Sequence, residues 1–489
     1  MLNVGNAGGD FWAPNINIVK DPRWGRLQET PGECPVLTST YAAEFVSHFQ
    51  ATGKARRVGD DDTYLRASSC CKHFAAYSEE NWDGLDRYHF DAVVSPREWR
   101  DTYEPAFQAC VVEANASGLM CSYNALNGKP TCADPELLRT LARDTFGFTG
   151  YVTGDCGAAE DVFATHHFAA TPAGAAAASL AAGMDIDCGS FVKANLPAAL
   201  ANASVPFTER QLDENVGHLF AVRLRLGLFD GDAFDPCGFK ALRPADVNAS
   251  AHNALALRAA VEGIVLLENK AGALPLARLA TWAVVGPLAD NGPTMQGVDC
   301  HGVPPFLITP REGIAALRTS TGDLVQTHYA PGCAISGSNT SGLDAAVTAV
   351  AASDVAVVLV GLDRTQEYEM RDRTSLLLPR IQRRLVEAAC ASAAQGGKRC
   401  VVGLISGGVI DVSEMASNPN VSALLWLGYP GQAGGEALAK LLVGDAAPSG
   451  RAPLTWYRES CEAPGLEPRW MRVLAWAAES EHISDPGSL

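Results

Sequence analysis

The sequence has no run of 18 or more apolar residues, so nothing in it predicts a membrane-spanning helix. Basic residues are also scarce, because 38 Lys and Arg stand against 55 Asp and Glu and give a net charge of −17. This balance argues against a nucleic-acid partner, since phosphate binding needs clustered Lys and Arg. The 14 cysteines include no C-x-x-C spacing, so the sequence predicts no metal site of that kind.

The remaining composition is that of a globular protein, with 47% hydrophobic and 19% charged residues. A chain of 489 residues is too long for one core and predicts two or three domains. Its first residues, MLNVGNAGGDFW, lack a basic start and an apolar core, so we do not expect a signal peptide there. The cysteines and five N-x-S/T sequons nevertheless favour an extracellular or secretory-pathway protein. The sequons lie at Asn115, Asn202, Asn248, Asn339 and Asn420.

Short apolar strands alternate with helical stretches in the first half of the chain. This repeated order predicts parallel strands with crossover helices. One helix, at 37–52, carries Tyr41, Phe45 and Phe49 on one face, and a last helix is expected at 208–230. The predicted strands lie at 13–19, 68–76, 118–126, 151–155 and 183–187, fewer than the eight of a closed barrel.

The second half reads as a doubly wound α/β sandwich. Its strands are continuous apolar runs, which suit a parallel sheet covered on both faces. The segment 428–444 lacks the G-x-G-x-x-G order of a phosphate-binding turn, so we interpret it as a tight turn and helix entry. A Gly-, Pro- and Asp-rich linker is expected at 231–250. Strands are predicted at 282–288, 355–362, 399–406 and 422–428, and helices at 344–353 and 378–392.

The stretch GYVTGDCGAAEDV, at 150–162, carries the clearest chemical signal. Its first part predicts a short buried strand, after which Asp155 stands where small residues turn the chain. In barrels of alternating strands and helices, catalytic side chains lie at this end of the strands. The alternative role for an acidic residue after a strand is a helix N-cap.

Further motifs occur in a fixed order with this one. Together they closely resemble glycoside hydrolase family 3, in particular its β-xylosidase branch of plants, algae and fungi. The resemblance covers roughly residues 3–457 and implies an N-terminal (β/α)8-type barrel at 1–230 and an α/β sandwich at 251–457, with a divergent tail at 458–489. The motifs are FWAPNINIVKDPRWGRLQETPGE, SCCKHFAAY, GLMCSYNALNGKPTCADPELL, AGMDIDCG and EYEMRDRTSLLLP.

The family resemblance implies two catalytic carboxylates. A retaining glycosidase needs one ionised nucleophile and one protonated acid. Asp155 matches the nucleophile, and Glu369, in E-M-R-D-R, matches the acid/base and is preferred to Glu367. The pKa of Glu369 is expected to be raised, with desolvation on substrate binding as the cause. From its charge pattern alone, the loop that carries Glu369 would be predicted to be a charged, solvent-exposed loop without a catalytic role. The reaction requires no cofactor and no metal.

Four further residues are implied to bind the sugar. Lys72 and His73 are adjacent on a strand, so a bulge or bend must bring both to one ligand; without the family, a solvated lysine and a core histidine would be expected. Arg26, closing DPRWGR, has a structural salt bridge with Glu29 or Glu33 as its alternative role. For Tyr123, packing in the protein core is the alternative to a role in sugar binding.

Cysteines bear on which sugar is bound. In the β-xylosidase branch, residues matching Cys156 and Cys188 form a disulfide beside the sugar, which favours a pentose. Free buried cysteine is the alternative. Cys121 and Cys132 are another plausible pair. Cys70 and Cys71 cannot easily pair with each other.

The expected function is that of a retaining exo-glycosidase that releases xylose from β-1,4-linked xylo-oligosaccharides or xylan. The resemblance also implies α-L-arabinofuranosidase activity as a second function. The partner is thus an oligosaccharide or polysaccharide, with no nucleic acid and no membrane; the sequence does not indicate an oligomeric state. The alternatives are a β-glucosidase of the same family and an inactive carbohydrate-binding relative. The second alternative arises because the resemblance implies that the chain starts at about the third barrel strand of the family, without the first strands.

Overall fold

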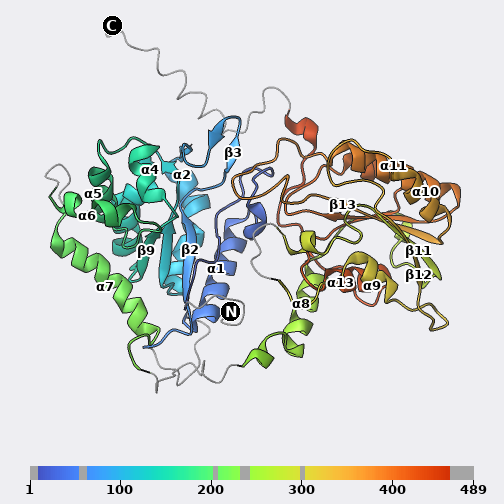
Figure 1. The fold of residues 1–489 in the computed structure, drawn as a ribbon, viewed down its shortest axis with the longest axis horizontal. Coiled ribbons are helices and arrows are strands. Elements are labelled where there is room, and N and C mark those ends of the chain that lie inside the picture. Colours follow the sequence, from blue (N-terminus) through green and yellow to red (C-terminus); the bar gives the residue numbers. More distant parts are fainter. Residues whose placement is uncertain (1–8, 54–62, 202–206, 232–242, 298–302, 463–489) are drawn as a thin grey trace, which may run out of the picture.

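Two α/β bodies lie side by side in the molecule (Figure 1). The computed structural model describes residues 9–53, 63–201, 207–231, 243–297 and 303–462. No helix in these ranges is long and apolar enough to cross a membrane. The expected class, an N-terminal (β/α) domain followed by an α/β sandwich, is confirmed.

Four parallel strands form the main sheet of the first body, in the order β1-β2-β6-β9. Helical chain lies between successive strands, so the predicted strand–helix–strand pattern is confirmed. The strands are β1 (Asp10–Phe11), β2 (Ser68–Phe74), β6 (Gly118–Cys121) and β9 (Tyr151–Gly154). The helices are α1 (Pro35–Gln50), α2 (Pro96–Glu98), α3 (Glu104–Gln108), η7 (Glu136–Thr145), α4 (Ala158–Ala164), α5 (Pro172–Ala182), α6 (Phe191–Leu200) and α7 (Glu209–Arg225).

The strand predicted at 13–19 is wrong in its position. The ladder covers only β1, and beyond it Asn15 makes a single bridge to β2. Pro14 has no N–H for a ladder. The side chains of Asn15 and Asn17 instead bond nearby groups, Asn15 to the N–H of Asn17 and Asn17 to β2.

The strand predicted at 183–187 is also absent as a ladder, and Ile186 makes one bridge to β9. Gly183 ends α5 with a φ of 111°, which turns the chain away from strand geometry. Asp185 is held there by Arg143, with an N–O distance of 2.7 Å. Hydrogen bonding by a buried carboxylate replaces regular strand pairing at this position.

The strand predicted at 118–126 divides into two. β6 ends at Cys121, and β7 (Ala125–Leu126) belongs to a separate small sheet with β5 (Asp91–Ala92) and β8 (Lys129–Pro130). A further hairpin is formed by β3 (Asn81–Trp82) and β4 (Leu85–Asp86).

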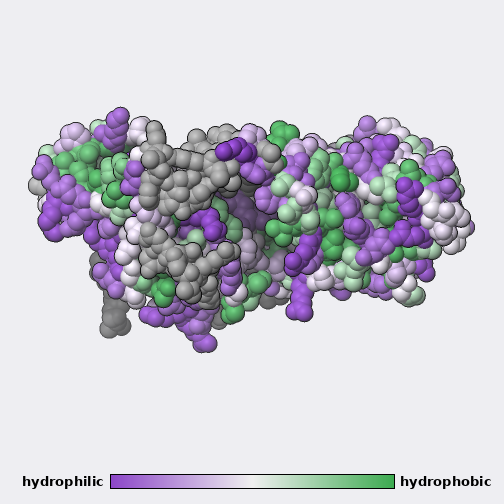
Figure 2. Space-filling view, turned by 90° about the horizontal axis from the view of Figure 1, so that it is seen from below, coloured by the Kyte–Doolittle hydropathy of each residue, from purple (hydrophilic) through white to green (hydrophobic). Residues whose placement is uncertain are grey.

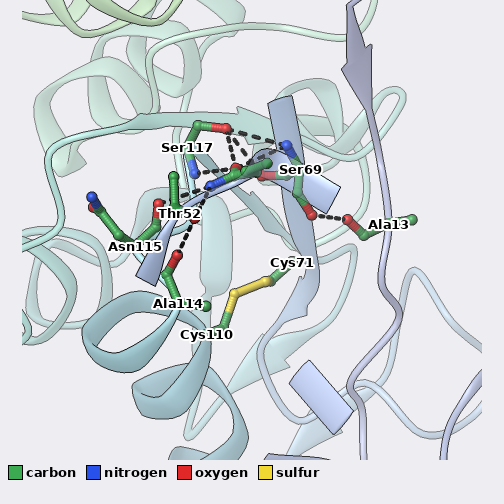
Figure 3. The surroundings of a disulfide bond; sticks show 9 residues. Ala13, Thr52, Ser69, Cys71, Cys110, Ala114, Asn115 and Ser117 are labelled. Carbon is green, nitrogen blue, oxygen red and sulfur yellow. Dashed lines mark hydrogen bonds between the residues drawn. A yellow bond between two sulfur atoms is a disulfide. The ribbon is translucent and has the colours of Figure 1, made fainter. Parts of the chain in front are cut away.

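Gln50, at the end of α1, bonds the segments that carry Ser69, Asn115 and Ser117, which Figure 3 shows near the Cys71–Cys110 disulfide. Its Oε1 accepts hydrogen bonds from the backbone N–H groups of Ser69 and Ser117, each at 3.0 Å. Its Nε2 donates to the carbonyl of Asn115 at 2.9 Å. A disulfide between Cys71 and Cys110 ties β2 to the helical chain after α3. These bonds fix β2 next to the residues that end it.

The second body contains a six-stranded sheet in the order β10-β15-β14-β13-β11-β12, parallel except for the β10–β15 pair. Four strands fall on the predicted runs, whereas β10 and β12 were not predicted. The strands are β10 (Val265–Asn269), β11 (Thr281–Val285), β12 (Gln326–Ala330), β13 (Val355–Gly361), β14 (Cys400–Ile405) and β15 (Ala423–Trp426).

Alternate residues of β13 enter two separate cores. Val357 and Leu359 belong to one, and Ala356, Val358 and Val360 to the other. Helices cover both faces of the sheet (Figure 1), as continuous apolar strands require. They are α10 (Leu343–Ala351) and α11 (Arg380–Gln395) on one face, and α8 (Ser250–Gly263), α9 (Pro310–Ala315) and α13 (Gly434–Leu442) on the other.

The segment predicted as a tight turn and helix entry leads into α13, which confirms that interpretation. Of the predicted linker, residues 232–242 lie outside the described residues, and the rest contains one short helical turn, Pro244–Asp246, before α8. Polar and apolar residues are interspersed over the described part of the lower face of both bodies (Figure 2).

Candidate active site

Asp155 lies at the carboxyl end of β9, as its strand-end position predicts. Its residue surface is 9% exposed. Oδ1 accepts a hydrogen bond from the N–H of Cys156 at 2.8 Å. Oδ2 is buried and has no hydrogen-bond partner among the residues that the structure describes. The alternative role as N-cap does not apply, because Gly157 precedes α4 and no side chain caps that helix.

Burial raises the pKa of Asp155 above its ordinary value. The charge of Arg26 opposes this rise most, followed by the Cys156 N–H, the charge of Lys72 and the hydroxyl of Tyr123. Two of the predicted sugar-binding cations therefore stabilise the ionised carboxylate, which is the form that a nucleophile needs.

Lys72 and His73 lie next to this carboxylate. The pairing of β2 with β6 shifts in register between Cys71 and Phe74, which supplies the irregularity that the sequence required. His73 Nε2 is 3.4 Å from Asp155 Oδ2. Burial lowers the pKa of His73, and the charges of Arg26 and Lys72 lower it further, so its imidazole is neutral.

Arg26 combines its predicted role with its structural alternative. Its guanidinium pairs with Glu29 through two bonds of 2.6 and 2.9 Å. Its Nη1 is also 3.7 Å from Glu369 Oε1, and its guanidinium lies over the ring of Tyr77. Glu33, the other suggested partner, accepts hydrogen bonds from Thr455.

Glu369 reaches the site from the second body, and its side chain is 36% exposed. Its Oε1 is 2.6 Å from Arg87 Nη1. Burial would raise the pKa of Glu369, but the charge of Arg26 and the bond from Arg87 outweigh it and hold the pKa below its ordinary value. In the ligand-free protein two guanidinium groups thus lower the pKa of this carboxylate, and the rise expected on substrate binding stays a prediction.

Glu367 lies in a different environment. It is 1% exposed, and its oxygens accept hydrogen bonds from the N–H groups of Gly407 and Gly408 and from the hydroxyl of Tyr429. Through these hydrogen bonds, the carboxylate of Glu367 fixes the chain that follows β14. Of the two glutamates considered, Glu369 is the one that contacts the residues around Asp155.

Tyr123 is 4% exposed and belongs to the core of the first body, as its packing alternative predicts. Its ring packs edge-on against Tyr88 at 5.0 Å, and the guanidinium of Arg87 lies 4.4 Å from its centre. Its hydroxyl donates to the carbonyl of Cys156 at 3.2 Å. The side chain thus connects the surroundings of Asp155 to Arg87, and through it to Glu369.

Sequence reasoning missed Glu80, which is buried beside these groups. Its Oε1 accepts from Trp24 Nε1 at 2.9 Å, and its Oε2 accepts from the Tyr77 hydroxyl at 2.7 Å. Oε2 is also 3.3 Å from Arg87 Nη1, the atom that contacts Glu369. Burial raises the pKa of Glu80 to about 7. The adjacent acids in SEENWDGLDR were the available signal.

Asp372 joins the two bodies at this point. Its Oδ1 accepts from the N–H of Gly25 at 2.7 Å, and its Oδ2 accepts from the N–H groups of Glu80 and Asn81, each at 2.8 Å. A Cβ at Gly25 would lie 2.0 Å from the carbonyl oxygen of Arg371, so only glycine permits this approach. The loop that carries Glu369 is therefore anchored to the first body.

The disulfides Cys156–Cys188 and Cys121–Cys132 confirm both predicted pairs. Two more, Cys71–Cys110 and Cys390–Cys400, were not predicted, since their partners are distant in the sequence or lie outside the motifs. Among the described residues, no three His, Cys, Asp or Glu side chains are grouped to hold a metal ion.

A parallel-stranded domain and an α/β sandwich that contribute carboxylates to the surroundings of one arginine, Arg26, are typical of the class of two-domain glycoside hydrolases. The sequence matches the glycosyl hydrolase family 3 N-terminal domain over residues 9–222 and the C-terminal domain of the same family over residues 264–479. The chain belongs to glycoside hydrolase family 3.

Similar proteins include plant enzymes and solved structures. The chain is 42% identical to a β-xylosidase/α-L-arabinofuranosidase 2 of Medicago sativa subsp. varia over 463 residues, which is 94% of this chain and 57% of the relative. It is 42% identical to β-D-xylosidase 1 of Arabidopsis thaliana, covering 94% of this chain and 56% of that protein.

A family 3 exo-β-xylosidase, solved with a xylobiose aziridine activity-based probe, matches with a TM-score of 0.85 and 37% identity, covering 94% of this chain and 57% of that one. A β-glucosidase from Listeria innocua, solved with isofagomine, matches with a TM-score of 0.80 and 30% identity, covering 93% and 60%. The chain thus spans a little over half the length of the relatives it matches.

Proposed function

We propose that this protein is a retaining, exo-acting glycosidase that releases xylose from β-1,4-xylo-oligosaccharides or xylan. The observation that carries the proposal is the free Oδ2 of Asp155, in a site that Glu369 enters from the other body. The names of the plant relatives and of the exo-β-xylosidase structure support xylose as the sugar and arabinofuranose as a second substrate.

In the proposed reaction, Asp155 Oδ2 attacks the anomeric carbon, and the bond to the glycosidic oxygen breaks as Glu369 gives that oxygen a proton. The resulting glycosyl ester is then hydrolysed by a water that Glu369 deprotonates. Arg26, Lys72, His73 and Tyr123 surround Asp155 or Glu369 and supply donors and acceptors for sugar hydroxyls.

Glu369 must gain a proton before it can act as an acid. Arg87 Nη1 is shared, at 2.6 Å from Glu369 and 3.3 Å from Glu80. When substrate occupies the site, movement of Arg87 towards Glu80 would remove the bond that keeps Glu369 ionised. Glu80, with its pKa near 7, would then lose its proton as it receives the guanidinium.

A pentose preference is supported by the Cys156–Cys188 disulfide, which directly follows Asp155. We expect a covalent link there to limit the room for the hydroxymethyl group that distinguishes glucose from xylose, as the family resemblance implies. β-Glucosidase activity is the second candidate, because family 3 β-glucosidases share the fold at 30% identity.

The test is hydrolysis of an aryl β-xyloside against an aryl β-glucoside by the purified chain, with Asp155→Asn as control. Turnover of the xyloside that is lost in the variant supports the proposal. Faster turnover of the glucoside supports the second candidate. No turnover of either by folded protein supports an inactive carbohydrate-binding relative.

We further propose that the protein acts outside the cell or in the secretory pathway. The four disulfides within the described part of the chain suit an oxidising compartment. The sequon residues Asn115, Asn248 and Asn339 are exposed, Asn420 is half-buried, and Asn202 lies outside the described residues. A loss of mass on enzymatic removal of N-glycans from protein made in the native host tests this; unglycosylated, thiol-reduced protein contradicts it.

A further inference from the structure

We propose that Asn17 is a positioning residue that holds His73 in the tautomer with no proton on Nε2, so that Asp155 Oδ2 receives no hydrogen bond from this ring. The inference rests on the proposed role of Asp155 as nucleophile. It concerns a contact behind the site, where Asn17 is 2% exposed and touches His73 at three points.

The hydrogen atoms of this contact follow from the backbone. The N–H of His73 donates to Asn17 Oδ1 at 2.8 Å, and Asn17 Nδ2 donates to the carbonyl of His73 at 2.8 Å. A backbone N–H can only donate and a carbonyl can only accept, so the orientation of the amide is fixed. His73 Nδ1 lies 3.0 Å from the same Oδ1, which only accepts. The Nδ1 atom must therefore carry the proton.

The other ring nitrogen then has only a lone pair to offer. The ring is 1% exposed among the cations Arg26, Lys72 and Arg87, so it stays neutral and has no second proton. Its Nε2 is 3.4 Å from Asp155 Oδ2, and neither atom has a hydrogen to share. This agrees with the observation that Oδ2 is buried without a hydrogen-bond partner among the described residues, whereas Oδ1 accepts the N–H of Cys156.

The arrangement suits the attack. A hydrogen bond to a carboxylate oxygen stabilises its charge and reduces its reactivity as a nucleophile. By directing the proton of His73 away from the site, Asn17 leaves the lone pairs of Oδ2 available. The bare Nε2 can still accept a hydrogen bond from a sugar hydroxyl, which agrees with the proposed binding role of His73.

Asn17 is itself fixed by the group that holds Arg26. Its N–H donates to Asn15 Oδ1 at 3.1 Å, and Asn15 Nδ2 donates to Glu29 Oε2 at 3.2 Å. Glu29 also pairs with Arg26. Glu29 thus positions the guanidinium of Arg26 directly and the imidazole of His73 through Asn15 and Asn17.

The first test reads the tautomer directly, by NMR of protein carrying 15N-labelled histidine, with the His73 signals assigned by their loss in His73→Gln. We expect an Nδ1 with a proton and an Nε2 without one. In Asn17→Asp, the new carboxylate stabilises the imidazolium, and both nitrogens should be protonated at neutral pH. A proton on Nε2 in the unchanged protein would overturn the inference, whether or not the enzyme turns over xylosides.

The second test measures the rate at which a 2-deoxy-2-fluoro-xyloside labels the protein. In Asn17→Asp we expect this rate to fall about tenfold at pH 6 and to recover as the pH rises and His73 loses its second proton. The control is Asn215→Asp, because Asn215 is an equally buried amide that bonds two backbone carbonyls near α5. An Asn17→Asp rate that falls equally at every pH, or does not fall, contradicts the inference.

Discussion

At the scale of single residues, the two carboxylates of the site lie in opposite surroundings. Burial raises the pKa of Asp155, whereas two guanidinium groups hold the pKa of Glu369 below its ordinary value. The proposed roles need an ionised Asp155 and a protonated Glu369. Arg26 lowers the pKa of both groups, so only a shift of its guanidinium from Glu369 towards Asp155 would change both in the required direction.

Replacing Glu369 by Gln removes the proposed proton donor. We expect kcat for xylobiose to fall by about 10²–10⁴-fold, because its leaving group needs a proton. An aryl xyloside with an acidic phenol should be affected far less in the step that forms the ester. The values of kcat/KM on both substrates report the step that forms the ester and measure the difference, and an equal loss of kcat/KM on both would contradict the role of Glu369 as acid.

Replacing Glu80 by Gln removes the second carboxylate that can receive Arg87. The guanidinium then remains on Glu369, so we expect kcat for xylobiose to fall by about tenfold with a smaller effect on an activated aryl xyloside. The alkaline limb of the pH profile should move to lower pH, since Glu369 is harder to protonate. An unchanged limb would show that Glu80 only packs against Tyr77 and Trp24.

At the scale of elements, the predictable parts are those with a regular apolar pattern. β9, β13 and β14 were found because their runs are buried on both faces. β10, which pairs antiparallel at the sheet edge, and β12, with the mixed sequence QTHYA, lack that pattern. Residues 13–19 were predicted as a short apolar strand, but the side chain of Asn17 bonds to β2 in place of a regular ladder.

The site was predictable to the same limited extent. The family motifs identify Asp155, His73 and Arg26, because each follows a recognisable strand or closes a fixed motif. Glu80 and Asn17 could not be found this way, since their importance comes from partners that only the fold brings near, such as Arg87 and the His73 ring.

The loop that carries Glu369 depends on Asp372, whose carboxylate accepts three N–H groups of the first body. In Asp372→Asn the amide nitrogen faces a donor, and the junction should loosen. We expect a higher KM and a lower unfolding temperature, by about 2–4 °C for each kcal/mol lost. Asp354→Asn is the control, because that carboxylate bonds Thr281 within the second body alone. Equal effects of both variants on KM would contradict the role of the junction.

At the scale of the whole molecule, an unpaired acid limits stability in alkali. Glu79 is 5% exposed, and neither carboxylate oxygen has a partner among the described residues. Burial, with the charges of Asp372 and Asp21, raises its pKa from 4.5 to about 8. The folded protein therefore holds a proton that the unfolded chain releases above pH 4.5, so stability falls as the pH rises towards 8 and the loss is complete above it.

Glu79→Gln should remove this loss. We expect its unfolding temperature to exceed that of the unchanged protein by about 2–4 °C at pH 9 and by less at pH 5. Calorimetry at both pH values measures the difference. The control is Glu44→Gln, at a carboxylate that is 50% exposed. A gain that is larger at pH 5, or absent at pH 9, would contradict the assigned cause.

The proposed reaction forms a covalent bond at one atom, Oδ2 of Asp155. The most direct measurement is to incubate the protein with a 2-deoxy-2-fluoro-xyloside, digest it and locate the added sugar by mass spectrometry. We expect the label on Asp155, in the peptide that spans GYVTGDCGAAEDV, and none in Asp155→Asn. A label on Glu369 or another residue, or a folded protein that acquires none, would contradict the central claim.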